Sequence, residues 1–219
     1  GFSIKNYYAS EIDKHSMKVS NTNYPDIIQL GDITQINDDV LSSLPKIDLV
    51  IGGSPCQDIS NLNKESNGLD GAKSGLFFHY YRILQWIKKN NNHDVLFLLE
   101  NVVGNKAAIS NISEIMGVEP ILINSSLVSA QQRNRYYWTD INVSSLPTDR
   151  NIVLKDILET EISEKYYLAG GRLKWLLGES GQKTVEKRYA AIDPVKANCL
   201  TARSDASWNC NYVTRNGQL

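Results

Sequence analysis

The first 140 residues of the chain alternate short apolar runs with longer polar or amphipathic stretches. The runs DIIQL, KIDLVIGG and DVLFLLEN are rich in aliphatic residues, and we also expect strands at NYYAS, PILINSSLV and RYYWTDI. Apolar strands separated by helices are typical of a mostly parallel sheet with helices on both faces. The pattern therefore predicts an α/β fold with a doubly wound, mostly parallel sheet.

The stretch GLFFHYYRILQWIKK predicts a helix, because its apolar residues recur at steps of three and four. Those apolar residues are Leu76, Phe77, Tyr80, Leu84 and Ile87. Residues 13–19 and 38–44 are weaker helix candidates. After about residue 140 the pattern changes, since VSSLPTDRN resembles a linker and no sustained period follows it. We therefore divide the chain into a larger domain, residues 1–140, and a smaller, incomplete region, residues 141–219.

Composition narrows the classes of protein that fit this chain. A net charge of −1 over 219 residues gives no global electrostatic attraction for nucleic acid, so such contacts must come from local clusters. No apolar stretch approaches the roughly 18 residues that span a bilayer, and the start of the chain does not resemble a signal peptide. Three widely spaced cysteines without a C-x-x-C pair disfavour a metal site and disulfides. We expect a cytoplasmic protein with reduced thiols, no bound metal and no membrane association.

Four reactive or acidic residues follow the expected strands, at the points where those strands end. Glu11 and Asp32 follow the first two strands, Cys56 follows KIDLVIGGSP, and Glu100 ends DVLFLLE. In open α/β sheets, ligands bind at the carboxyl edge of the strands. An acid after the second strand of such a sheet commonly binds a ribose. The sequence therefore predicts a site at this edge.

Cys56 is either a packed core residue, as most free cysteines are, or a nucleophile. Gly52 and Gly53 let the backbone turn sharply, and Pro55 fixes it before the thiol. A thiol at the start of a helix has a lowered pKa and favours the nucleophilic thiolate. A phosphatase loop is disfavoured, because its arginine position holds Leu62. The three histidines have sequence surroundings that suggest the surface, which disfavours a Cys–His pair.

Glu100 and the two arginines Arg133 and Arg135 leave similar alternatives open. A carboxylate that ends so apolar a run either caps a neighbouring helix or shares a proton with a ligand nitrogen. The two arginines alternate along an expected strand and so point to one face. They either line a solvated edge or share an anion, such as a phosphate or the Glu100 carboxylate.

Taken in order, these motifs resemble those of the C5-cytosine DNA methyltransferases. The motif residues are Glu11, Gly31-Asp32, Pro55-Cys56-Gln57, Glu100-Asn101-Val102, Gln131, Arg133 and Arg135. The stretch SPCQDIS, with GLFFHYYRIL, LLENVV and RYYW, is also similar to animal de novo and phage-type enzymes. The resemblance covers roughly residues 1–138, and it implies the Rossmann-like fold of S-adenosylmethionine-dependent methyltransferases.

The resemblance implies roles for the catalytic residues. Cys56 would add to C6 of a cytosine flipped out of double-stranded DNA, and Glu100 would hold N3 and the exocyclic amine. Arg135, with Arg133, would position the base or its phosphate and steady Glu100. Further substrate contacts would come from Ser54, Gln57, Asn101, Val102 and Gln131.

The resemblance also implies that S-adenosylmethionine is the methyl donor. Glu11 would bind its ribose hydroxyls and Asp32 its adenine amine. Further contacts with this cofactor would come from Ile12, Ile33, Pro55 and Leu76.

Two motifs of the family are missing from the sequence: the glycine-rich first motif and the late motif that completes the cofactor site. We therefore expect a chain cut at both ends, with little methyltransferase activity by itself. Residues 141–219 would form a partial target recognition region. Its basic residues, which either bind phosphates or form a solvated surface, are Arg172, Lys174, Lys183, Lys187 and Arg188. A cognate restriction endonuclease is a possible partner.

Three other functions compete with this interpretation. A tRNA methyltransferase would share the Pro-Cys and Glu-Asn-Val motifs, although the similarity around GLFFHYYRIL favours DNA. A regulatory paralogue is expected to lose Cys56, Glu100 or Arg135, and all three are present. A thiol hydrolase would explain Cys56 but would leave Glu11 and Asp32 without a role.

Overall fold

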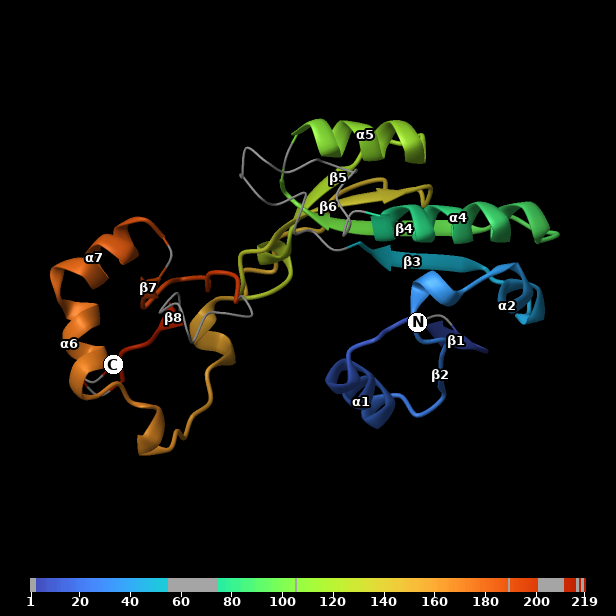
Figure 1. Ribbon diagram of the computed structural model, residues 1–219. Helices are drawn as coiled ribbons and strands as arrows, with labels where there is room; N and C mark the ends of the chain where they lie inside the picture. The colour runs from blue at the N-terminus through green and yellow to red at the C-terminus, as the bar shows by residue number, and fades with distance from the viewer. Residues whose placement is uncertain are drawn as a thin grey trace. The chain divides into compact units, whose positions relative to one another are not determined.

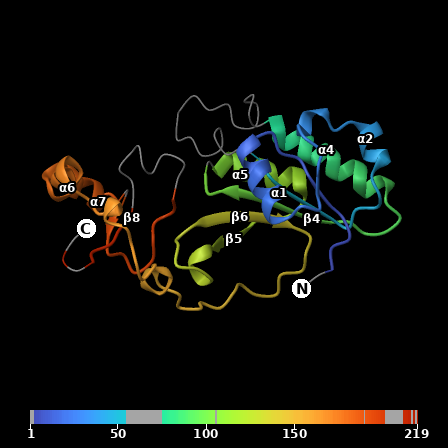
Figure 2. The ribbon, with the colours of Figure 1, turned by 90° about the horizontal axis from the view of Figure 1, so that it is seen from below.

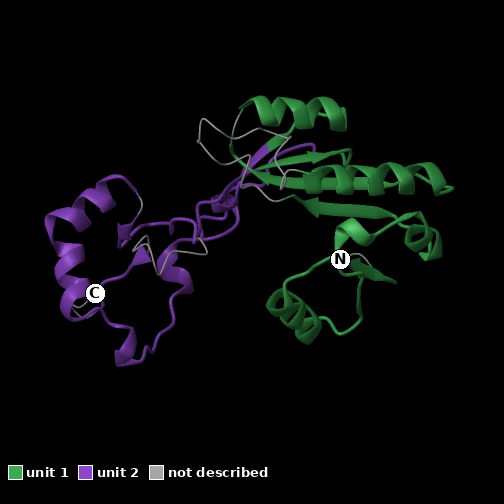
Figure 3. Cartoon of the chain, viewed as in Figure 1, with its two compact units in different colours: residues 1–121, 136–142 green, residues 122–135, 143–219 purple. Residues whose placement is uncertain are grey.

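The computed structural model describes residues 3–54, 75–104, 106–188, 190–200, 211–215, 217 and 219. The chain divides into two compact units (Figure 3), and we describe each by itself. The first unit holds residues 1–121 and 136–142, and the second holds residues 122–135 and 143–219. The predicted domain boundary near residue 140 stays a prediction.

The first unit alternates strands and helices along the chain (Figure 1), as the sequence pattern predicts. Its first half contains β1 (Tyr7–Ala9), α1 (Lys14–Asn23), β2 (Ile27–Gln29), the 3-10 helix η1 (Ile33–Gln35) and α2 (Asp38–Ser43). Next come β3 (Leu49–Gly53), α4 (Gly75–Asn90), β4 (Leu96–Val102) and α5 (Lys106–Met116). The chain then passes through β5 (Ile121–Asn124) and the 3-10 helix η3 (Ser125–Leu127), which belong to the second unit from residue 122 on, and returns to the first unit within β6 (Asn134–Thr139).

The strands of the described residues form separate small sheets instead of the single sheet that we expected. One sheet has four strands in the order β3-β4-β6-β5, and β4 and β6 run side by side in Figure 2. The strands β1 and β2 form a second, parallel sheet. The α/β class and the parallel pairing are confirmed. The division lies between β1 and β3: β3 is an end strand of its sheet, and among the described residues it does not pair with β1.

The parallel pair β3–β4 organises the first unit. Its register places Val50 opposite Phe97 and Gly52 opposite Leu99. Phe97 and Leu99 are buried in one core cluster with residues of α4 and α5, so both helices pack on this face. On α4, four of the five predicted apolar positions are buried, and Leu76 is half-buried.

Gly52 is the residue that lets α4 approach the sheet. A Cβ atom built on Gly52 would lie 2.5 Å from two carbons of the Tyr80 ring. The Tyr80 hydroxyl donates to the carbonyl oxygens of Val50 and Leu98, at 3.4 and 3.3 Å. Burial raises the pKa of the Tyr80 phenol well above its usual value, so the group stays a neutral donor. We expected Gly52 in a sharp turn, but it lies within β3 and makes room for an aromatic ring.

Trp138 and Asp140 hold β6 and the residues after it to the same core. The Trp138 side chain is fully buried, and its Nε1 donates to Ser113 Oγ of α5 at 2.9 Å. Asp140 accepts a hydrogen bond from the backbone of Phe97 at 2.8 Å and pairs with Lys88 at 2.9 Å. Sequence periodicity did not reveal α5, although its Ala108 and Ile112 are buried in this cluster.

The opposite face of the β3–β4 pair is more exposed than we expected. Alternation along a strand places Leu49, Ile51 and Leu96 on this face. Their exposed fractions are 41%, 61% and 43%. Parallel sheets are normally covered on both faces, and among the described residues α4 and α5 cover one face of this pair.

The two weaker helix predictions are confirmed, and each helix begins at a side-chain cap. Asp13 accepts a hydrogen bond from the backbone of Ser16 at the start of α1, at 2.7 Å. Asn37 does the same for Val40 at the start of α2, at 3.0 Å. Short polar acceptors of this kind satisfy backbone N–H groups that the first helical turn leaves free.

The second unit has short elements around a small core of its own. They are the 3-10 helices η4 (Leu154–Ile157) and η5 (Glu164–Tyr166), the helices α6 (Gly170–Leu177) and α7 (Glu179–Glu186), and the strands β7 (Ala191–Ile192) and β8 (Asn211–Tyr212). Its core contains Leu176, Ala190 and Tyr212. A Cβ on Gly181 would lie 2.3 Å from the Trp175 carbonyl oxygen, so glycine lets α7 fold against α6. Elements this short carry too few turns to give a sequence period.

In the part of the chain that the structure describes, no helix combines the length and apolarity that crossing a membrane requires.

The Gly52–Tyr80 contact gives a stability prediction. Gly52→Ala forces the Tyr80 ring or the strand to shift, so the free energy of unfolding should fall by about 1–3 kcal/mol in denaturant titration. Gly75→Ala is the matched control, because apart from its chain neighbours and its own helix backbone no described atom lies within 4 Å of its Cβ position, and alanine favours helices. Equal stability of the two variants would contradict the packing described here.

Candidate active site

The carboxyl ends of β3 and β4 bring Glu100 beside Gly53. The register pairs Gly53 with Glu100. A Cβ on Gly53 would lie 3.4 Å from Glu100 Oε2, so the carboxylate lies over the Gly53 backbone. Glu100 is half-buried and makes further interactions of its own. The Glu100 carboxylate therefore lies within van der Waals reach of the Gly53 position at this edge.

Asn101 projects to the other face, toward the helices, and is 1% exposed. Its Nδ2 donates to Ser54 Oγ at 2.9 Å and lies 3.4 Å from the Ser54 carbonyl oxygen. Its Oδ1 accepts from the backbone N–H of Val102 at 2.8 Å. Glu100 and Asn101, which are adjacent in β4, thus lie against Gly53, the last residue of β3, and Ser54, the residue after it.

Three of the predicted site residues, Pro55, Cys56 and Gln57, lie outside the described residues. Ser54 is the last described residue before them, and Cys56 follows it by two positions in the sequence. The structure therefore describes the strand end from which the cysteine segment starts.

Glu11 and Ile12 follow β1, as predicted. Glu11 Oε1 accepts two backbone hydrogen bonds, from Ile12 at 2.7 Å and from Asp13 at 2.8 Å. These bonds fold the carboxylate back over the start of α1 and leave Oε2 for other donors. Ile12 is 71% exposed, which makes its side chain available to an apolar partner.

Asp32 and Ile33 follow β2 and begin η1. Asp32 Oδ1 accepts a hydrogen bond from the backbone N–H of Thr34 at 2.8 Å. This bond lowers the pKa of the Asp32 carboxyl below its ordinary value of 3.8, and the charge of nearby His79 contributes in the same direction. Ile33 is half-buried against the core cluster. The 3-10 helix η1 contacts α4, which carries Leu76 in its first turn.

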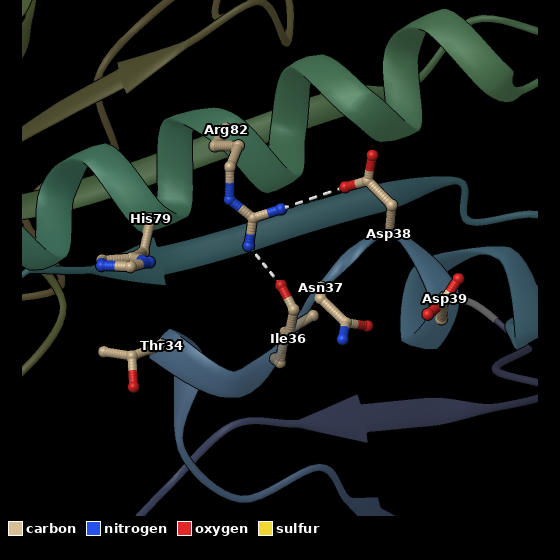
Figure 4. A pocket seen from close by; sticks show the side chains of 7 residues that line it. All are labelled: Thr34, Ile36, Asn37, Asp38, Asp39, His79 and Arg82. Atoms are coloured by element: carbon tan, nitrogen blue, oxygen red, sulfur yellow. Dashed lines mark hydrogen bonds and ion pairs between the residues drawn. The ribbon is translucent and has the colours of Figure 1, made fainter.

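A hollow of about 410 Å³ lies between η1, α2 and α4 (Figure 4). It is lined by Thr34, Ile36, Asn37, Asp38, Asp39, His79 and Arg82. Arg82 closes one side, because it donates to the Ile36 carbonyl oxygen and pairs with Asp38 at 3.4 Å. Sequence reasoning missed this hollow, since its residues come from three elements. His79 lies on the predicted helix beside Tyr80, and nothing in that sequence pattern indicates that its side chain lines a hollow.

Gln131, Arg133 and Arg135 belong to the second unit, whereas Glu100 belongs to the first. Gln131 forms a parallel bridge with Ala197, and Arg133 comes just before β6. Arg133 Nη1 donates to Cys199 Sγ at 3.6 Å, and Arg135 Nη1 donates to the Asn134 carbonyl oxygen at 2.7 Å. Both residues make other interactions as well.

Within the described ranges of the chain, no three histidine, cysteine, aspartate or glutamate side chains gather as a metal site would require. The side chains at the strand ends are carboxylates and amides bound to backbone N–H and hydroxyl groups.

A parallel α/β unit with acids after successive strands is the arrangement of enzymes that bind a nucleotide-like cofactor at the strand ends. Comparison with known proteins identifies the family of the chain. A family model for C-5 cytosine-specific DNA methylases matches residues 1–212, and the chain belongs to this family.

Its relatives include type II methyltransferases of several bacteria. The chain is 28% identical over 209 residues to M1.ScrFI of Lactococcus lactis subsp. cremoris, a match that covers 84% of this chain and 50% of the relative. It is 32% identical over 192 residues to M.BanI of Aneurinibacillus aneurinilyticus, covering 72% and 42%. The chain thus spans half the length, or less, of these curated relatives.

The Asp32 cap gives a pH prediction. Because the folded pKa of Asp32 lies below 3.8, its carboxylate adds stability above that pH, and this contribution disappears as the pH falls through the folded pKa. The stability difference between the unchanged chain and Asp32→Ala should stay constant from about pH 7 to pH 5 and shrink below about pH 4. Thermal unfolding across this pH range measures it.

Asp26→Ala is the control for this series, since its carboxylate makes no hydrogen bond or ion pair within the described residues. A pH-independent difference for Asp32→Ala would show that the carboxylate does not act as the cap.

Proposed function

We propose that the chain carries the catalytic and cofactor-binding residues of a DNA (cytosine-5-)-methyltransferase. The single observation that carries this proposal is the β3–β4 register, which places the Glu100 carboxylate against Gly53 at the start of the Pro55-Cys56 segment. An acid and a thiol from neighbouring strand ends are the two groups that attack on a cytosine ring requires. The family match supports this assignment.

The thiolate of Cys56 is proposed to act as the nucleophile. C6 of cytosine is a poor electrophile, so a new S–C6 bond is needed to make C5 electron-rich. C5 then takes a methyl group from S-adenosylmethionine, which leaves as S-adenosylhomocysteine. Loss of the proton from C5 to a base and breaking of the S–C6 bond restore the aromatic ring and the thiolate.

Glu100 is proposed to bind the cytosine at N3 and the exocyclic amine. Addition at C6 builds negative charge on the ring, and hydrogen bonding of the Glu100 side chain at N3 and the exocyclic amine stabilises that charge in the transition state. The position of the carboxylate beside Gly53, three residues before Cys56 in the sequence, supports this role. Val102, the next member of the motif, donates its backbone N–H to Asn101 Oδ1.

The residues around η1 and β1 fit the adenosine part of S-adenosylmethionine. Glu11 keeps one carboxylate oxygen for a pair of ribose hydroxyls, since Oε1 already accepts two backbone hydrogen bonds. Asp32 stays ionised, as its lowered pKa requires, and accepts a hydrogen bond from the adenine amine. Ile12, Ile33 and Leu76 provide the apolar contacts, and Pro55 adds to them. When bound, the cofactor supplies an electrophilic methyl group.

The second unit is proposed to contribute to contact with double-stranded DNA. Arg133 and Arg135, with Gln131 beside them, are suited to hold the flipped cytosine or a flanking phosphate. Basic residues also lie on α6 (Arg172 and Lys174) and on or after α7 (Lys183, Lys187 and Arg188). Their phosphate contacts position the DNA without specifying its sequence.

Trapping on 5-fluorocytosine tests the proposal. Fluorine at C5 cannot leave as a proton does, so a working nucleophile stays covalently bound to the base. We would incubate the chain with S-adenosylmethionine and substituted DNA. In parallel we would test a chimera in which this chain replaces the matching half of M1.ScrFI, because that relative is longer than the chain. The expected result is a denaturant-resistant adduct that maps to Cys56 and is absent from Cys56→Ser.

The remaining outcomes separate the alternatives. An adduct on similarly substituted tRNA, and none on DNA, would replace the DNA proposal with an RNA methyltransferase. No adduct from either polypeptide, with S-adenosylmethionine bound, would reject Cys56 as the nucleophile. Cys56→Ala provides a second null variant, and Cys199→Ser controls for reaction at another thiol.

A further inference from the structure

We propose that Arg82 of α4 is a positioning residue that ties the end of η1 to α4 and so orients Asp32 and Ile33 for S-adenosylmethionine. This inference rests on the proposed function, since Asp32 and Ile33 are proposed contacts of that cofactor. It gives a role to a residue that the sequence patterns did not single out. Arg82, η1 and the first turn of α4 all lie within the described residues.

The 3-10 helix η1 is a single turn that is closed by bonds of its own. The N–H of Gln35 donates to the Asp32 carbonyl oxygen at 3.0 Å, and the N–H of Thr34 donates to the Asp32 side chain at 2.8 Å. The N–H of Ile36 donates to the Ile33 carbonyl oxygen at 3.3 Å. Because all these bonds lie within the turn, they fix its shape but not its orientation in the protein.

Apolar packing holds η1 against the core without fixing its direction. Ile33 is half-buried against the core cluster, and Ile36 at the end of the turn is 4% exposed. The hydrophobic effect depends on the area removed from water and is non-directional. A turn held by these two side chains alone could therefore tilt about them, and a directional contact from another element is needed to orient it.

Arg82 supplies such a contact from α4. Its Nη2 donates to the Ile36 carbonyl oxygen, and its Nη1 pairs with Asp38 at the start of α2, at 3.4 Å. Figure 4 shows the guanidinium group reaching from α4 toward both residues. A guanidinium group is planar and presents its donors at fixed angles. The two contacts therefore restrain the end of η1 and the start of α2 together.

The bond to Ile36 is the stronger of the two contacts. The side chains of Arg82 and Asp38 are 40% and 73% exposed, and ion pairs as exposed as this contribute little. The bond to the Ile36 carbonyl oxygen is partly buried and has a charged donor. Hydrogen bonds with a charged partner are stronger than those between neutral groups. We therefore assign the positioning role to the Ile36 contact.

The helix α4 connects this contact with the proposed cofactor site. Leu76 lies in the first turn of α4, six residues before Arg82, which is a rise of about 9 Å along the helix. Asp32 and Ile33 begin the turn that Ile36 ends. One bond at Ile36 thus sets both residues relative to Leu76. Its loss should leave the chain folded while the spacing of these proposed contacts varies.

Hydrogen–deuterium exchange tests the contact without cofactor or DNA. Exchange at the backbone amides of Gln35 and Ile36 is followed by nuclear magnetic resonance on the intact chain. Arg82→Met removes the donors and keeps an apolar stem. Exchange at both amides should rise about tenfold, the factor by which loss of one charge-assisted hydrogen bond changes a local opening equilibrium. Arg82→Lys keeps a charged donor and should recover most of the protection.

The affinity for S-adenosylmethionine tests the consequence for the proposed site. Titration calorimetry gives the Kd of the chain and of its chimera with M1.ScrFI. Arg82→Met should weaken binding at least about threefold, because binding must then also order η1. Arg82→Lys should bind nearly as tightly as the unchanged chain.

Two further variants separate positioning from general stabilisation. Lys46→Met is the matched control, since Lys46 Nζ also donates to a backbone carbonyl oxygen, that of Asn90 at the far end of α4. It should leave the exchange at Gln35 and Ile36 and the Kd unchanged. Asp38→Asn removes the exposed ion pair and should change each quantity by less than about twofold.

Unchanged exchange in Arg82→Met would overturn the inference, as would an equal rise in Lys46→Met. Faster exchange with an unchanged Kd would also overturn it. If Arg82→Met does not fold, Arg82→Gln, which shortens the side chain and removes its charge, takes its place. Failure of the proposed function would appear differently, because neither the unchanged chain nor the chimera would then bind S-adenosylmethionine, and exchange would still decide on the contact.

Discussion

The parallel pairing of β3 with β4 is the interaction on which the rest of the first unit depends. Its register buries Phe97 and Leu99 beneath the helices, aligns Gly52 with the Tyr80 ring and places Gly53 opposite Glu100. Parallel strands keep this register because a shift by one residue would turn the buried side chains outward. Core packing and the candidate active site are therefore set by one ladder of hydrogen bonds.

Much of this arrangement could be predicted from the sequence. Aliphatic runs locate the strands, the steps of three and four in GLFFHYYRIL locate α4, and acids at strand ends mark the edge where ligands bind. The helix α5 could not be predicted, because its buried residues include alanine and serine, which carry little hydrophobic signal. The role of Gly52 also depends on Tyr80, a residue that lies far along the chain and meets it only in the fold.

The residues of the candidate site stay predictions, and their contacts within the fold could not be read from the sequence. The family resemblance implies that Glu100 and Asn101 both contact the substrate. The structure separates them, because Glu100 lies at the edge beside Gly53 and Asn101 is buried against Ser54. In the second unit, Arg133 was expected within a strand and instead precedes β6, where it contacts Cys199. Contacts between residues distant in sequence carry no local pattern by which they could be found.

The most direct test of the central claim compares two reactions of Cys56 in a Glu100→Gln variant. The claim is that Glu100 acts on the same cytosine as the thiol without itself activating the thiol. We predict that adduct formation on 5-fluorocytosine DNA slows by about 100-fold or more. Alkylation of Cys56 by iodoacetamide should meanwhile keep the rate of the unchanged chain. An unchanged rate of adduct formation, or an equal loss in both reactions, would contradict the account.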